Sequence, residues 1–221
     1  MKQYRGKLSS KQAADGMNAA LRNARRLLED SKLLFEAKRY ASAASLAILS
    51  VEESGKSPIL RSLARNEDEA ALKLKWSQFR NHRAKNIMWQ LPQLARNGRR
   101  TFAELASLFD PKSDHSKVLD EVKQVGFYTD CLGENGNWSE PTEIITEELA
   151  RGLIETAEIM GGDKEQVSER EIELWVEHMG TNLESSNTDD LRKFYKALVK
   201  EGLAKVTMEQ VEKFLGEDKS G

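Results

Sequence analysis

The sequence contains few of the residues that interrupt helices or cross-link a chain. Its 221 residues contain four prolines, 7% aromatic residues and a single cysteine, Cys131. One cysteine cannot form an intrachain disulfide, and the three histidines and this cysteine are not clustered as they are in zinc sites. We therefore expect a reducing, cytoplasmic environment and no metal or other cofactor.

Long apolar runs are also missing. No stretch approaches the ~18 consecutive apolar residues that a membrane span requires. The first residues, from Met1 to Arg5, lead into polar sequence rather than into the apolar run of an export signal. We therefore expect a protein that is neither exported nor embedded in a membrane.

The charged residues are present in nearly equal numbers but are unevenly distributed. The chain has 34 Lys and Arg against 36 Asp and Glu. The first 100 residues hold 21 basic and 9 acidic residues, a formal charge of +12, and the remainder holds 13 and 27, a charge of −14. Such asymmetry suggests an anionic partner for the basic half. The 39% of hydrophobic residues suffices for a folded core.

Residues that favour helices dominate, so the sequence predicts an all-α fold. A capping box at Ser9 and Gln12 begins a long helix over 9–37, and the small, apolar run 41–51 indicates a helix buried on all sides. We expect further helices at 67–96, 101–110, 114–132 and 143–160. No convincing strand is found, and residues 133–141 are typical of a loop.

The C-terminal part is separated by a predicted hinge at Gly161, Gly162 and Asp163. Cap signals at Ser168 and Thr207 predict three shorter helices near 168–179, 188–201 and 207–215. We therefore divide the chain into a helical bundle at 1–160 and a small acidic helical appendage at 161–221. About 55 residues fold poorly alone, so the appendage should lean on the bundle.

The first candidate site residues follow the apolar helix. The Gly-Lys-Ser sequence at 55–57 lacks the preceding strand and the earlier glycine of a phosphate-binding loop, since position 50 is Ser. Glu52 and Glu53 precede Lys56, and the plainest interpretation is a solvated ion pair. Because adjacent helical residues point about 100° apart, at least one carboxylate should instead approach a neighbouring helix and need a basic partner there.

A second polar group lies in the predicted third helix. His82, Lys85 and Asn86 share one helical face, with Arg80 and Arg83 close in sequence. Such a set could bind a phosphodiester, and His82 could act as a general acid or base. The competing interpretation is an ordinary surface histidine among charges.

Three stretches in this order resemble the AbiV family of abortive-infection proteins, which are HEPN-type helical domains. The stretches are 40–56, 79–85 and 127–130, with Trp138 and Pro141 beyond them. The resemblance implies a HEPN-like bundle, an antiphage role, a homodimer and interference with RNA or translation. It adds Tyr128 and Asp130 to Glu52 and Glu53 as residues that organise the site.

Many HEPN proteins are metal-independent ribonucleases in which four to six residues separate an Arg from the catalytic His. Here those positions hold Lys75, Trp76 and Ser77, so the motif is absent. The leading hypothesis is an antiphage effector that binds RNA or the ribosome and that would cleave RNA as an endoribonuclease. In this hypothesis His82, Arg80 and Arg83 are catalytic, and Lys56, Lys85 and Asn86 bind substrate.

Two alternatives remain open at this stage. One is a non-catalytic helical module that binds a phage trigger or a host protein through its acidic half. The other is a helical assembly protein in which Glu53, Lys56 and His82 form a buried network that fixes helix register. Convergence of His82, Lys56 and Glu53 in one cleft would favour a functional site over the interpretation as ordinary surface residues.

Overall fold

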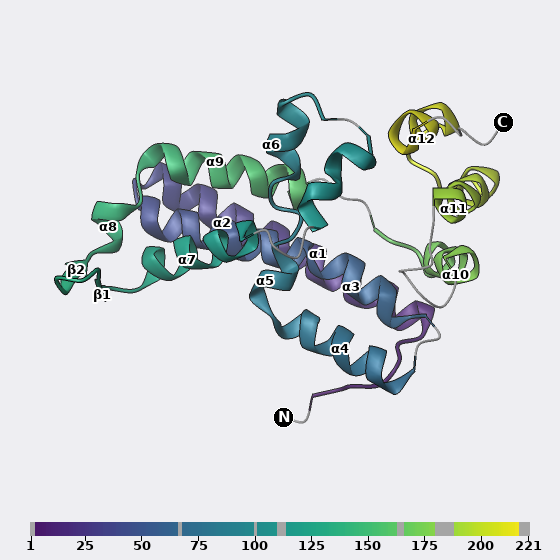
Figure 1. The fold of residues 1–221 in the computed structure, drawn as a ribbon, viewed down its shortest axis with the longest axis horizontal. Helices are drawn as coiled ribbons and strands as arrows, with labels where there is room; N and C mark the ends of the chain where they lie inside the picture. The colour runs from purple at the N-terminus through teal and green to yellow at the C-terminus, as the bar shows by residue number, and fades with distance from the viewer. Residues whose placement is uncertain are drawn as a thin grey trace.

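The fold was analysed in a computed structural model, which describes residues 3–65, 68–99, 101–109, 114–162, 166–179 and 188–216. Helices make up most of these residues, and the one sheet among them is a two-stranded hairpin. The predicted all-α class is therefore confirmed. Figure 1 shows an elongated molecule with the hairpin at one end and the C-terminal helices at the other.

Two long helices form the centre of the bundle. Helix α1 (Ser10–Glu36) begins with the predicted capping box, in which Ser9 and Gln12 exchange hydrogen bonds of 3.1 and 2.9 Å. Helix α2 (Tyr40–Ser54) packs along it, and its small residues let the backbones approach closely. Ser31 donates a hydrogen bond to the Ala43 carbonyl at 2.7 Å, across this contact. Both helices agree with the sequence prediction.

The rest of the main core comes from the acidic half of the chain. Helices α7 (His115–Phe127) and α9 (Glu147–Ala157) pack on α2, with the short α8 (Pro141–Ile144) between them in sequence. Ile48, Val51, Leu119 and Leu153 are central members of this core. After α9 the chain continues in a π-helical turn, η2 (Glu158–Gly162), which contains Gly161 and Gly162 of the predicted hinge. Asp163 lies outside the described residues.

The single helix predicted over 67–96 is wrong. After α3 (Lys56–Leu63), the structure has α4 (Glu69–Arg80), α5 (His82–Lys85) and α6 (Leu91–Arg96), followed by the 3₁₀ helix η1 (Ala103–Phe109). Asn81 interrupts the helix with φ −89° and ψ 124°, and its side chain accepts hydrogen bonds from the Arg83 and Ala84 N–H groups. Asparagine favours this capping role over a helix interior.

A β-hairpin replaces the end of another predicted helix. Helix α7 ends at Phe127, and β1 (Asp130–Leu132) then pairs antiparallel with β2 (Asn137–Ser139), with Cys131 opposite Trp138. Gly133 and Gly136 take φ values of 73° and 65° in the turn. The prediction of no strand was wrong because three residues are too few to show an alternating pattern.

The three C-terminal helices form as predicted. They are α10 (Glu169–His178), α11 (Thr188–Lys200) and α12 (Met208–Leu215), with capping boxes at Ser168 and Thr207. Helices α10 and α11 share a small core that includes Leu174, Phe194 and Leu198. Figure 1 shows them set beside the end of α1 and α3 rather than along the bundle.

Candidate functional site

The carboxylate of Glu52 lies at the meeting point of three helices. Its side chain is in the last turn of α2 and only 3% of it is exposed. Its Oε1 accepts a hydrogen bond of 2.6 Å from Lys123 Nζ of α7. Its Oε2 lies 2.6 Å from His82 Nδ1 and 3.5 Å from Lys85 Nζ, both of α5. A buried carboxylate therefore holds α2, α5 and α7 to one point.

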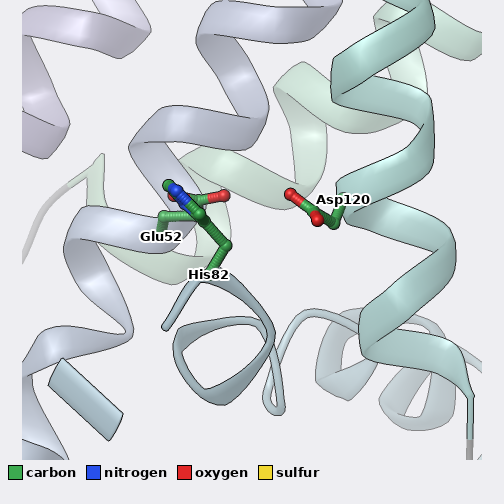
Figure 2. A group of neighbouring side chains, drawn as sticks. All are labelled: Glu52, His82 and Asp120. Carbon is green, nitrogen blue, oxygen red and sulfur yellow. The ribbon is translucent and has the colours of Figure 1, made fainter. Parts of the chain in front are cut away.

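Asp120 completes what we call the central cluster, which comprises Glu52, His82, Lys85, Asp120 and Lys123. Lys123 Nζ lies 2.8 Å from Asp120 Oδ1, so this ammonium joins two carboxylates. Figure 2 shows Glu52, His82 and Asp120 pointing toward one another from different elements. The two carboxylates and two ammonium groups balance in charge, which makes their burial tolerable.

The environment keeps the Glu52 carboxyl ionised. Burial raises the pKa of this group, but hydrogen bonds from Lys123 and His82 outweigh that effect and leave the pKa below its ordinary value. Burial lowers the pKa of Lys85, and the attraction of Glu52 only partly offsets it. For Lys123 burial also lowers the pKa, yet the hydrogen bonds to Asp120 and Glu52 leave it raised.

The ionised carboxylate fixes the proton position on His82. A carboxylate only accepts hydrogen bonds, so Nδ1 of the imidazole must carry the hydrogen that it donates to Glu52. In the neutral ring Nε2 then carries the lone pair. Half of the His82 side chain, 51%, is exposed, whereas its partner is buried. The cluster thus presents an oriented imidazole base at the protein surface.

Gly55 explains how α5 reaches this position. It lies in the αR region at the end of α2, and a Cβ atom there would be 1.9 Å from the Lys85 carbonyl oxygen. Only a residue without a side chain lets the backbone of α5 pass so close. The next segment is fixed by Trp89 Nε1, which donates to the His115 carbonyl at 3.0 Å, and by a 3.0 Å contact between His115 Nε2 and the Ile87 carbonyl.

Three side chains of the cluster could in principle serve as metal ligands. Atoms of Glu52, His82 and Asp120 lie within 4.8 Å of one another. The ammonium of Lys123, however, is already 2.6 and 2.8 Å from the two carboxylates, where a cation would have to bind. The residues therefore do not fit a divalent metal unless Lys123 is displaced, and we derive no chemistry through one.

The structure brings two of the predicted site residues, His82 and Lys85, to this carboxylate. His82 and Lys85 contact Glu52 directly, as expected for a functional set. Lys56 instead forms an ion pair of 2.5 Å with Glu53 and lies 5.3 Å from the centre of the Phe79 ring. Glu53, Lys56 and His82 therefore do not form one network among themselves, because His82 contacts Glu52 while Lys56 pairs with Glu53.

The other three residues from the same segment are placed differently. Arg83 is exposed beside His82 and forms no ion pair with any residue that the structure describes. Arg80 donates to the carbonyls of Trp76 and Tyr4 at 3.1 and 3.0 Å, which ties the N-terminal segment to α4. Asn86 is fully buried, and no described group bonds its side-chain amide, so a substrate on the surface does not reach it.

Tyr128 and Asp130 lie away from the central cluster. Tyr128 is exposed and packs its ring against Phe127, while Asp130 begins the hairpin and accepts a hydrogen bond from the Cys131 N–H at 2.7 Å. Figure 1 places the hairpin at one end of the molecule and α5 near its middle. Their proposed organising role has no support in these contacts.

Sequence reasoning missed Lys123 and Asp120. Both are ordinary charged residues three positions apart in a predicted helix, a pattern that usually indicates a solvated pair. The one available signal was Glu52 itself, whose burial required a cation from some neighbouring helix. Nothing in the sequence indicated which lysine this would be.

A comparison with protein families supplies the identity of this helical arrangement. The HEPN_AbiV family model, described as AbiV, matches residues 12–162. The chain belongs to the AbiV family. The match to AbiV spans α1 to η2 and includes every member of the central cluster. AbiV proteins are abortive-infection proteins of the HEPN type, a group that often forms dimers.

The two other comparisons add no relative. No curated protein and no solved structure matches the chain. In the described residues of this AbiV-family protein, no helix is both long enough and apolar enough to span a membrane. The helices after η2 lie beyond the family match.

Proposed function

We propose that this protein is an abortive-infection effector that cleaves RNA without a metal ion, with His82 as general acid and base. The observation that carries the proposal is the exposed imidazole whose Nδ1 is held at 2.6 Å by the buried Glu52 carboxylate. This arrangement fixes the tautomer of the ring and leaves Nε2 to act as the base. RNA cleavage would account for interference with translation.

The reaction that fits one such histidine is transfer of the phosphodiester to the neighbouring 2′-hydroxyl. His82 Nε2 takes the 2′-hydroxyl proton, the 2′-oxygen bonds to phosphorus, and the bond to the 5′-oxygen breaks. The same proton then passes to the 5′-oxygen. The products are a 2′,3′-cyclic phosphate and a 5′-hydroxyl, and no metal or co-reactant is consumed.

The cations near His82 have separate parts in this proposal. Arg83 follows His82 on α5 and is exposed, so it is the group best placed to stabilise charge that develops on phosphate. Lys85 and Lys56 contribute positive potential from less exposed positions. Arg80 is left out because its guanidinium is bound to backbone carbonyls.

The direct test is cleavage of a single-stranded RNA by purified protein in EDTA, with end analysis of the products. We expect 2′,3′-cyclic phosphate ends, and His82→Ala should reduce the rate by at least about 10²-fold. His178→Ala, at the end of α10, is the matched control and should retain activity. Undiminished cleavage by the His82→Ala protein, or dependence on a divalent metal, would overturn the proposed mechanism.

A second candidate function, recognition of a phage or host protein without catalysis, is favoured by the hairpin. Trp138 has 75% of its surface exposed, and Tyr128 is also largely exposed. Tyrosine and tryptophan are enriched in protein interfaces. If Trp138→Ser abolished protection against phage while His82→Ala preserved it, this alternative would replace the nuclease proposal.

We also propose that the protein acts as a homodimer, because HEPN proteins often form dimers. A dimer would place two copies of the exposed imidazole in one particle. Light scattering on purified protein should then give twice the chain mass of 25.0 kDa. A monomeric mass at working concentration would contradict this part of the proposal.

A further inference from the structure

A cavity of about 390 Å³ opens beside the central cluster, between α3, α4 and α5. Its lining includes the apolar residues Pro58, Ile59, Ala84, Ile87 and Met88. Cavities of this volume fall in the range that holds small ligands or single groups of larger ones. Its walls can therefore bury a flat apolar surface.

Lys85 links the cavity to the central cluster. This residue lines the cavity, and its Nζ lies 3.5 Å from the Glu52 oxygen that also holds His82. Gly55 lines the cavity as well, at the point where the backbones of α2 and α5 meet. A group bound in the cavity would thus lie next to the group that reacts at His82.

Polar residues of α4 complete the lining. Lys75 and Gln78 both line the cavity, and no described residue pairs with the Lys75 ammonium or the Gln78 amide. Lys85 is already balanced by Glu52, so Lys75 is the charged residue of the lining that can attract an anion. A second cavity of about 480 Å³ between α6 and α9 has Arg96 and Glu148 in its lining and shows no such bias.

We propose that the cavity next to α5 binds a nucleobase of single-stranded RNA, from the nucleotide beside the cleaved phosphodiester. The apolar walls would cover the faces of the base, the Gln78 amide would hydrogen-bond to its edge, and Lys75 would pair with a flanking phosphate. A base in a duplex would first have to leave the stack, which favours single strands. This inference rests on the proposed RNA-cleaving function.

The test compares two short RNA strands that the protein cannot cleave because every 2′-hydroxyl is methylated. One carries bases and the other has the same backbone without them. Fluorescence anisotropy should show that the protein binds the base-bearing strand about tenfold more tightly or better, as expected when a base is stacked or buried. Gln78→Ala and Met88→Trp should reduce this preference to about threefold or less.

Gln93→Ala, which alters a glutamine of the second cavity, is the matched control and should keep the full preference. Circular dichroism establishes whether each variant is folded. If Met88→Trp does not fold, the test relies on Gln78→Ala, because Gln78 is a half-exposed residue of α4. Equal binding of both strands, or an unchanged preference in folded variants, would overturn the base pocket while leaving RNA cleavage intact. Failure to bind either strand would overturn the proposed function as well.

Discussion

At the scale of single residues, the central cluster depends on one buried carboxylate. Glu52 has ionic contacts with Lys123 and Lys85 and accepts a hydrogen bond from His82, and Asp120 pairs with Lys123 on its other side. Removing one member of a buried ionic set leaves the others without compensation, which costs more than the set contributes as a whole. Glu52 should therefore matter for stability as well as for orienting His82.

Glu52→Gln should lower the free energy of unfolding at pH 7 by about 3 kcal/mol, because it leaves two buried ammonium groups short of one negative charge. The folded-state pKa of Glu52 lies below its ordinary value of 4.5, so its stabilising effect is present above about pH 4.5. That effect is lost as the pH falls through the folded-state pKa. Urea unfolding at a series of acidic pH values should accordingly show that the free energy of unfolding falls less steeply with decreasing pH in the variant.

Glu29→Gln is the control for this measurement, since Glu29 is an exposed carboxylate of α1. It should leave nearly unchanged both the free energy of unfolding at pH 7 and the way in which that free energy falls with decreasing pH. If the Glu52→Gln protein had the same free energy of unfolding and the same dependence on pH as the unchanged protein, the charge balance described above would be contradicted.

The sequence allowed the recognition of only part of this cluster. The Glu52–Glu53 pair and the segment around His82 stand out as polar groups within otherwise apolar or basic surroundings, so both were predicted as site residues. Lys123 was not, because only the fold brings α7 to α2. The structure does not support the assignment of Asn86 to substrate, because Asn86 at the end of α5 is fully buried whereas His82 at its start is exposed.

At the scale of elements, long helices with capping boxes were predictable and short elements were not. Helices α1, α10 and α12 begin at the predicted caps, since the cap and the periodic apolar face agree. The four-residue helix α5 and the three-residue strands are too short for a periodic pattern. Their positions are set by tertiary contacts, above all the approach of α5 to Gly55.

Gly55→Ala should therefore lower both the melting temperature and the rate of RNA cleavage. The φ of −67° and ψ of −9° at Gly55 suit alanine, so the backbone conformation gives no penalty. The penalty comes from the new methyl group, which must displace the backbone of α5 and with it His82. Thermal unfolding and the RNA cleavage assay, run on the same preparation, measure the two effects.

Gly152→Ala provides a matched comparison, because Gly152 lies within α9 and an added Cβ atom there meets no atom within 4 Å. This change should raise stability by up to about 1 kcal/mol, the usual gain when alanine replaces glycine in a helix. If Gly55→Ala and Gly152→Ala changed stability in the same direction, the close approach of α5 would not explain why position 55 holds a glycine.

At the scale of the whole molecule, the opposite charges of the two halves are joined within the fold. Lys32 of α1 pairs with Glu158 at 2.6 Å, and Arg96 of α6 pairs with Glu155 at 2.9 Å. The central cluster reverses the pattern, because an acid of the basic half meets Lys123 of the acidic half. The acidic half is therefore part of the bundle that builds the site, and the charge asymmetry does not divide the molecule into separate bodies.

The C-terminal helices also connect to this bundle. Asn18 of α1 donates a hydrogen bond to the Val167 carbonyl and accepts one from the Val167 N–H, both at 2.8 Å. Ile172 of α10 is fully buried among apolar residues of α1 and α3, and Arg61 of α3 lies 4.9 Å from the Trp175 ring centre. The appendage thus continues the core at one end of the bundle.

Ile172→Ala should consequently destabilise the whole protein and not the appendage alone. The loss of a buried isoleucine side chain costs about 2–5 kcal/mol, and the cavity would lie against α1 and α3. Hydrogen exchange should show protection falling together in α2 and α11, within a single unfolding transition. Val199→Ala, at a position of α11 that is 42% exposed, should change stability by less than about 0.5 kcal/mol. Loss of protection confined to α10–α12 would instead define residues 161–221 as a separately folding domain.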